Sequence, residues 1–160
     1  MLRMSKLTDY GTLILAHLSG ADGDLHTAAD IAARTGLGVP TASKLLKILG
    51  KAGLVTSVRG SQGGYQLARP ADEISAAEVI DALEGPVSIT VCSSGAGNCE
   101  IESLCLVGSA WQRINVAIRR ALKDVSLAQL TGAPGTDYPL IDLTSAVVPE
   151  EQHLGKDGSH

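Results

Sequence analysis

The chain of 160 residues contains no phenylalanine, and its aromatic side chains are one tryptophan and three tyrosines. Because 44% of the residues are nonetheless hydrophobic and strands favour aromatic residues, we expect an aliphatic, mostly helical core. No apolar run is long enough to span a bilayer, and the first residues lack the apolar stretch of a secretory signal. These absences predict a cytoplasmic protein without a membrane partner.

Cysteine is equally scarce, because the only three, Cys92, Cys99 and Cys105, fall within fourteen residues. An odd number of thiols cannot pair off, which argues against a secreted, disulfide-stapled scaffold. Thiolates clustered on a glycine-bearing loop are suited to binding an iron–sulfur cluster or zinc. An enzyme with a reactive cysteine is disfavoured, since no histidine lies near the cysteines in the sequence.

Charge is distributed unevenly along the chain. The net charge of −4 combines +4 over residues 1–70 with −8 over residues 71–160. A basic N-terminal half is typical of a surface that faces a polyanion, although chance unevenness would look the same.

The N-terminal half has the pattern of a helix-turn-helix. Hydrophobic spacing and capping residues predict helices near residues 5–20, 28–35 and 39–52, the last two joined by a tight glycine turn. On the third helix the apolar face carries Ala42, Leu45, Leu46 and Leu49. The opposite face carries Thr41, Ser43, Lys44, Lys47 and Lys51. These five residues are candidates for phosphate and base contacts, the alternative being an ordinary solvated helix face.

A hairpin follows directly, with strands predicted at 54–58 and 65–67. A hairpin after the second helix of a helix-turn-helix is a wing, and its tip adds five candidate DNA-binding residues. They are Arg59, Gly60, Ser61, Gly63 and Gly64. A phosphate-binding NTPase loop is disfavoured, because no helix follows directly and no Lys-Ser or Lys-Thr closes the loop.

The C-terminal half is predicted to contain a short helix near 76–84, the cysteine loop, and a long helix. Apolar residues of the long helix recur in steps of three and four, forming a heptad seam. The seam comprises Leu104, Val107, Trp111, Ile114, Ile118, Ala121 and Val125. We expect this seam to form a homodimer, since helix-turn-helix proteins usually read two half-sites. Packing on the N-terminal domain of the same chain is the alternative.

These elements suggest four parts of the chain. They are a winged helix-turn-helix domain at 1–70, a connector helix and cysteine loop at 71–102, a dimerisation helix at 103–130 and a mostly mobile tail at 131–160. The expected fold class is mainly α with a small β-hairpin wing.

Residues 1–130 resemble a family of bacterial winged-helix iron–sulfur regulators that includes the IscR, SufR and NsrR types. The resemblance lies in residues 4–10 (MSKLTDY), 29–32 (ADIA), 51–55 (KAGLV) and 58–67 (VRGSQGGYQL), followed by the cysteine triad and the tryptophan-bearing helix. The opening and the wing look closest to the regulators of Suf-type cluster assembly.

The resemblance implies a homodimer that binds double-stranded operator DNA and holds a 2Fe–2S or 4Fe–4S cluster through Cys92, Cys99 and Cys105. Some members place a histidine three residues after the last cysteine, where this chain has Gly108. Nitric-oxide-sensing members use an aspartate of the first helix of the other subunit, and Asp9 occupies the matching position. Asp9 is therefore the expected fourth ligand. Glu100, Glu102 and His17 are weaker candidates.

The implied function is a repressor of iron–sulfur assembly genes, whose DNA binding depends on cluster occupancy, and not an enzyme. A nitric-oxide-sensing repressor of the same family is one alternative. A zinc-stabilised structural or interaction module is an alternative of a different class.

Overall fold

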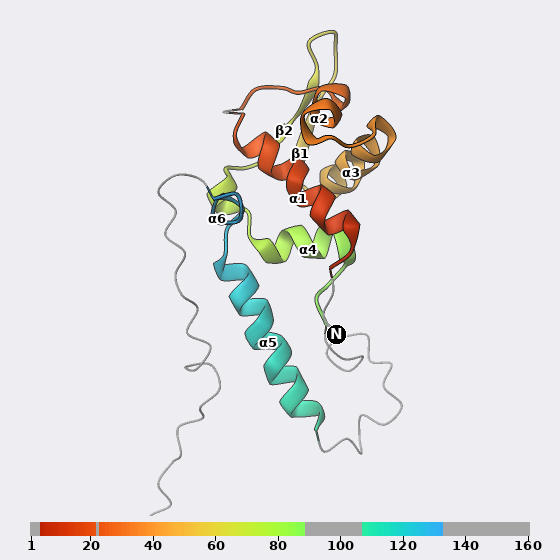
Figure 1. Cartoon of the computed structure of the whole chain (residues 1–160). Coiled ribbons are helices and arrows are strands. Elements are labelled where there is room, and N and C mark those ends of the chain that lie inside the picture. The colour runs from red at the N-terminus through yellow and green to blue at the C-terminus, as the bar shows by residue number, and fades with distance from the viewer. Residues whose placement is uncertain (1–3, 22, 89–106, 133–160) are drawn as a thin grey trace, which may run out of the picture.

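The computed structural model describes residues 4–21, 23–88 and 107–132. In chain order these form α1 (Lys6–Ser19), α2 (Ala28–Thr35), α3 (Val39–Lys51), β1 (Val55–Val58), β2 (Gly64–Leu67), the 3-10 helix η1 (Ala71–Glu73), α4 (Ala76–Glu84), α5 (Gly108–Asp124) and α6 (Leu127–Leu130). Helices α1 to α3 and the hairpin gather at one end of the molecule, and α5 extends away from them beyond α4 (Figure 1). The mainly α fold with a hairpin wing is as predicted.

Side-chain caps set the helix boundaries close to the predicted positions. Thr27 and Ser75 each form a capping box with an acidic residue three positions on, Asp30 and Glu78. These boxes satisfy backbone N–H groups that the first helical turn leaves free. Gly36 ends α2 with a φ of 70°, a left-handed conformation that favours glycine.

The core is aliphatic, in agreement with the composition. Ile14 and Leu15 of α1 lie at its centre, packed among the inner faces of α2 and α3. Helix α6 also contributes, because Leu127 is 0% exposed and lies within the same cluster. The short helix near the end of the described chain therefore belongs to the core of the N-terminal domain.

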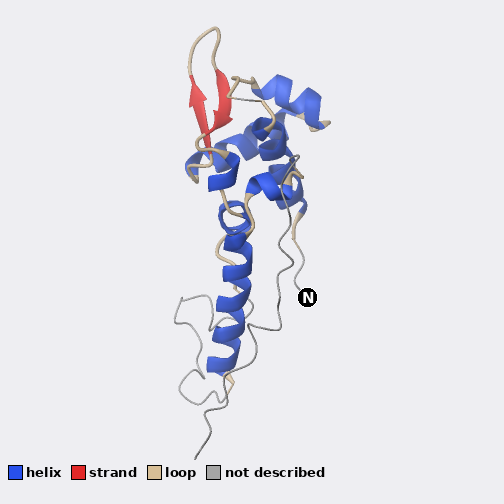
Figure 2. Ribbon diagram, turned by 90° about the vertical axis from the view of Figure 1, so that its left-hand side faces the viewer, coloured by secondary structure: helices blue, strands red, loops and turns tan. Residues whose placement is uncertain are grey.

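The wing is an antiparallel pair in which Val55 faces Leu67 and Val58 faces Gly64. It stands out from the helical body as a long loop (Figure 2). The segment before α2 pairs with β2, since His26 and Tyr65 exchange two backbone hydrogen bonds of 3.1 and 2.8 Å. This third segment holds the wing to the chain that enters α2, next to the turn.

The long C-terminal helix is shorter than predicted. The sequence predicts a dimerisation helix over 103–130, but in the described residues α5 ends at Asp124 and α6 is separate. The break arises because residues 125–127 pair with residues 74–76 through backbone hydrogen bonds of 2.8 and 2.7 Å. Val125 therefore lies beyond the helix, and Leu104 lies outside the described residues. No helix within the described ranges has both the length and the apolar character needed to cross a membrane.

Candidate nucleic-acid interface and metal centre

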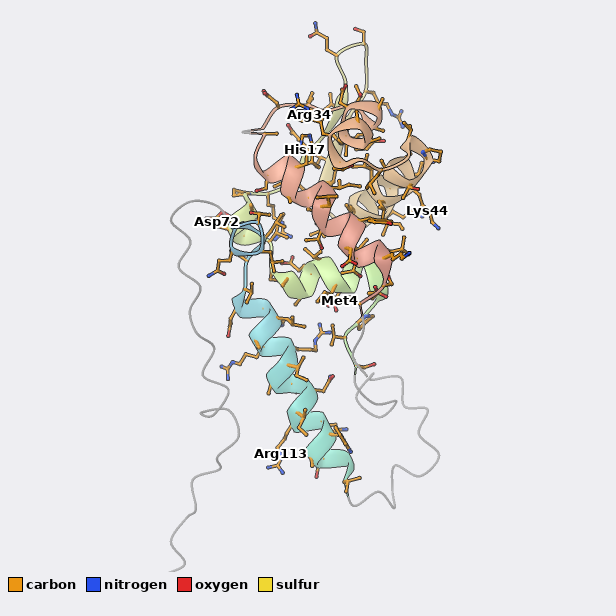
Figure 3. All side chains as sticks on the ribbon, viewed as in Figure 1. Met4, His17, Arg34, Lys44, Asp72 and Arg113 are labelled. Atoms are coloured by element: carbon orange, nitrogen blue, oxygen red, sulfur yellow. The ribbon has the colours of Figure 1, made fainter. Side chains whose placement is uncertain are left out.

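Helix α3 presents the basic surface that its sequence predicts. Its inner residues are fully buried, whereas Lys44, Lys47 and Lys51 are exposed and Thr41 and Ser43 are half-buried. Lys44 points away from the body of the molecule (Figure 3). The burial of the apolar face leaves the polar face of α3 free to enter a DNA groove.

The tip of the wing adds a second exposed surface beside α3. Arg59, Gly60 and Ser61 are all exposed, and Gly60 adopts a φ of 128°. Gly63 closes the turn by donating a 3.0 Å hydrogen bond to the carbonyl of Gly60. A groove between the start of α2 and the wing is lined in part by Thr27 and Arg59. The guanidinium of Arg59 is exposed there and can hydrogen-bond to phosphate oxygens.

Gly63 and Gly64 have a structural role that the sequence pattern does not reveal. A Cβ on Gly63 would stand 2.2 Å from the carbonyl oxygen of Val58, and one on Gly64 would stand 2.8 Å from that of His26. Both contacts are with backbone atoms, so neither neighbour can swing aside. These glycines are required by the hairpin turn and by its pairing with the His26 segment. Their proposed contact with DNA stays a prediction.

A pair of histidines lies where α1 meets the wing. The rings of His17 and His26 meet edge to face, with centroids 4.9 Å apart. In the described chain the Nε2 atom of each ring is buried and has no hydrogen-bond partner. Burial, aided by the neighbouring His26 and Arg34, lowers the pKa of His17. His17 lies two helical turns from Asp9, at the opposite end of α1, so its position does not favour the role of cluster ligand.

We expect His17 to make folding stability depend on pH in a defined window. Because its pKa is lower in the folded chain, the unfolded state takes up the proton first as the pH falls below about 6.5. The stability present above that pH is therefore lost as the pH falls through the folded pKa. The slope should stay below the roughly 1.4 kcal/mol per pH unit that one whole proton would give.

Urea unfolding between pH 7.5 and 5.5 measures this slope, and His17→Gln should flatten it. The capping carboxylate of Glu78, whose pKa is lowered by hydrogen bonds from the Ser75 backbone and from Arg69, acts in a different window, below pH 4.5. A variant with an unchanged slope between pH 5.5 and 7.5 would show that His17 is not the responsible group.

All three cysteines lie in 89–106, outside the described residues. Within the described ranges, no three His, Cys, Asp or Glu residues are placed to hold a metal. Asp9, the expected fourth ligand, is described, and its side chain is exposed in the first turn of α1. Thiolates and carboxylates are donor types that suit iron or zinc, and the ligation of a metal by Asp9 together with the cysteines stays a prediction.

Two carboxylates of α4 lie at the approach to the cysteine segment. Glu84 accepts hydrogen bonds from the Ser5 backbone, at 2.9 Å, and from the hydroxyl of buried Thr8. Hydrogen bonding by the Ser5 side chain, by the Thr8 hydroxyl and by the Ser5 backbone lowers the pKa of Glu84. These hydrogen bonds fix the first turn of α1, which carries Asp9, to the end of the helix that leads into the cysteines.

Asp81, one turn earlier on α4, pairs with Arg119 of α5. The guanidinium donates two hydrogen bonds of 2.8 and 3.2 Å to the two carboxylate oxygens. The backbone N–H of Val87 donates a third, of 3.2 Å, to one of those oxygens. No local pattern in the sequence predicts this pair, because its members are 38 residues apart.

Several apolar side chains of helix α5 are exposed in the described chain. Buried Asn115 and partly buried Arg119 lie on the side that faces α4. The neighbouring seam contains exposed Val107, Trp111 and Ile114, the last two being 40% and 44% exposed. Ile118 and Ala121 of the same seam are half-buried. A continuous exposed apolar strip of this kind marks an interaction surface.

Comparison with known proteins agrees with this architecture. A model of the Rrf2 family, described as an iron-dependent transcriptional regulator, matches residues 4–133. A putative helix-turn-helix transcriptional regulator of Haemophilus influenzae is 36% identical over 129 residues, which cover 78% of this chain and 85% of that protein.

Two solved structures share the fold. The CymR global cysteine regulator of B. subtilis is 31% identical with a TM-score of 0.63, and the match covers 86% of this chain and all of that one. IscR of T. potens is also 31% identical with a TM-score of 0.59, and the match covers 82% of this chain and 87% of that one. The chain therefore belongs to the Rrf2 family, and it is a winged-helix transcriptional regulator rather than an enzyme.

Proposed function

We propose that this protein is an iron–sulfur-sensing repressor of cluster-assembly genes, which binds operator DNA as a homodimer in the cytoplasm. The observation that carries the proposal is the position of the three cysteines. They follow α4, whose end is bonded to the first turn of α1, and precede α5, whose apolar seam is exposed. The resemblance of the opening and the wing to Suf-type regulators supports the assembly genes as targets.

The DNA interface is built from α3 and the wing. Lys44, Lys47 and Lys51 supply charge for phosphates, and half-buried Thr41 and Ser43 lie where base edges would be read. Arg59 at the tip of the wing would reach an adjacent phosphate or a narrow minor groove.

The dimer would form through the exposed seam of α5. A second copy is the occupant we infer, because a twofold axis along the seam would place Trp111 and Ile114 of both chains against each other. Twofold symmetry would also present two α3 helices to two half-sites of one operator.

The cluster would be held by Cys92, Cys99 and Cys105, with Asp9 of the partner subunit as the fourth ligand. When bound, it would supply a redox-sensitive iron centre, and a carboxylate among its ligands would make it easy to lose. Ligation by Asp9 would join the segment between α4 and α5 of one subunit to α1 of the other. That connection would set the spacing of the two α3 helices, and its loss would favour dimers that do not fit the operator.

The likeness to CymR, named as a global cysteine regulator, shows that the shared fold does not by itself define the signal. The cysteine triad supports a metal-based signal for this chain. Nitric oxide stays the alternative stimulus, because the same cluster and ligands would serve it. The identity of the regulated genes separates the two.

Iron and acid-labile sulfide analysis of protein purified without oxygen tests the cofactor. We expect a brown protein with visible absorption and iron and sulfide in equal amounts. Replacing the three cysteines by serine should abolish the colour, while replacing Asp24 by asparagine, on an exposed turn away from α4, should not. Colourless protein containing zinc would reject the proposal and favour the zinc-stabilised module.

A further inference from the structure

The carboxylate of Asp81 joins three parts of the chain at one point. It projects from α4, receives both Nη groups of Arg119 from α5, and accepts the backbone N–H of Val87, which follows α4. The pair is partly shielded from water, with 29% of the Arg119 side chain and 31% of the Asp81 side chain exposed. Bidentate, partly shielded pairs of this kind are stronger than exposed surface pairs.

The residues that Asp81 binds flank the cysteine-bearing segment in the sequence. Val87 comes five residues before Cys92, and Arg119 comes fourteen residues after Cys105. The hydrogen bonds of Asp81 therefore hold the chain on both sides of the cysteine-bearing segment. Fixing these flanks lowers the entropy that the segment must lose when its thiols gather around one centre.

The second ion pair of α4 in the described chain does not flank the cysteines, because both of its members precede them. Arg69 binds Glu78 at 2.7 Å, and Arg119 binds Asp81 at 2.8 Å, so the two pairs have nearly equal lengths. Arg69 also donates to the carbonyl of Glu73, which is part of η1. That pair therefore joins the hairpin end of the N-terminal domain to the start of α4, and it provides an internal control.

We propose that Asp81 is a positioning residue for the cysteine-ligated centre, holding the approach to Cys92 against α5 without touching the metal. The proposal rests on the proposed function. Residues that orient metal ligands from outside the first coordination sphere commonly change metal affinity by about 10-fold to 100-fold. Since Asp81 acts through the chain and not through a ligand, the lower end of that range is expected.

The test compares the full-length wild-type protein with Asp81→Ala, Asp81→Asn and the control Arg69→Ala. Three quantities are measured without oxygen: the rate at which a ferrous chelator bleaches the visible absorption, the hydrogen exchange of the Val87 amide, and the thermal midpoint. Asp81→Ala should lose its cluster about 10 times faster than the wild type and exchange the Val87 amide faster. Asp81→Asn, which keeps an oxygen for Val87, should give an intermediate rate.

Arg69→Ala should lower the thermal midpoint yet leave both rates at the wild-type value. If Arg69→Ala and Asp81→Ala speed cluster loss equally, or if cluster loss follows the thermal midpoint in all variants, the positioning role is overturned. A colourless wild-type protein would reject the proposed function instead. In that case faster exchange of the Val87 amide in Asp81→Ala would still support the holding role, and unchanged exchange would overturn it.

Discussion

Replacing Lys44, Lys47 and Arg59 together by alanine is expected to lower the affinity for operator DNA by about 100-fold at physiological salt. The three side chains are exposed on α3 and at the tip of the wing, and none has an ion-pair partner in the described chain. Each lost phosphate contact should also make the dependence of log affinity on log salt shallower by about one unit, because fewer counterions are released.

The measurement is fluorescence anisotropy on duplex DNA selected from a random pool by the cluster-loaded protein, repeated over a salt series. Lys123→Ala, in the last turn of α5, is the matched control, since it removes an exposed positive charge far from α3 and the wing. Wild-type affinity and salt dependence in the triple variant would place the DNA on another face of the molecule.

Substituting Ile114 by glutamate is expected to convert the homodimer into monomers. The change puts a charge into the seam of both copies at once and removes two buried apolar side chains. Burying the exposed 44% of Ile114 contributes about 1 kcal/mol per copy, and a glutamate buried in its place costs at least about 1 kcal/mol more per copy. The dimer should therefore weaken by about 4 kcal/mol, which is about 1000-fold in the dissociation constant. Operator affinity should fall with it, because a monomer contacts one half-site.

Val116→Glu is the control for this substitution. Val116 is 65% exposed, more than Ile114, yet it lies on the side of α5 away from the seam. Sedimentation velocity at micromolar concentration should show a dimer for Val116→Glu and a monomer for Ile114→Glu. If both variants are dimers, or if both are monomers, the seam does not form the interface.

Most of the fold could be predicted because local signals determine it. Thr27 and Ser75 mark helix starts through hydrogen bonds to groups three residues away, so a short window of sequence contains the whole motif. The alternation of lysine and leucine on α3 likewise gives its buried and exposed faces directly.

The features that escaped prediction depend on contacts between distant parts of the chain. The heptad pattern extends through Val125, and only pairing with residues 74–76 shows why the helix ends before it. Likewise, Gly64 belongs to a glycine-rich stretch that looks like a flexible tip. In the structure its lack of a side chain allows the close approach of the His26 backbone. The ion pair of Asp81 with Arg119 depends entirely on how α4 and α5 pack.

We expect DNA binding to depend on the iron–sulfur cluster, and a comparison of the loaded and the cluster-free protein tests this dependence. Operator affinity is measured for a single anaerobic preparation before and after a chelator removes the iron, with circular dichroism confirming that the fold is retained. A coupling of 1–3 kcal/mol is typical of such switches, so we expect the cluster-free protein to bind about 10-fold or more weakly. Equal affinity in the two forms would contradict the account.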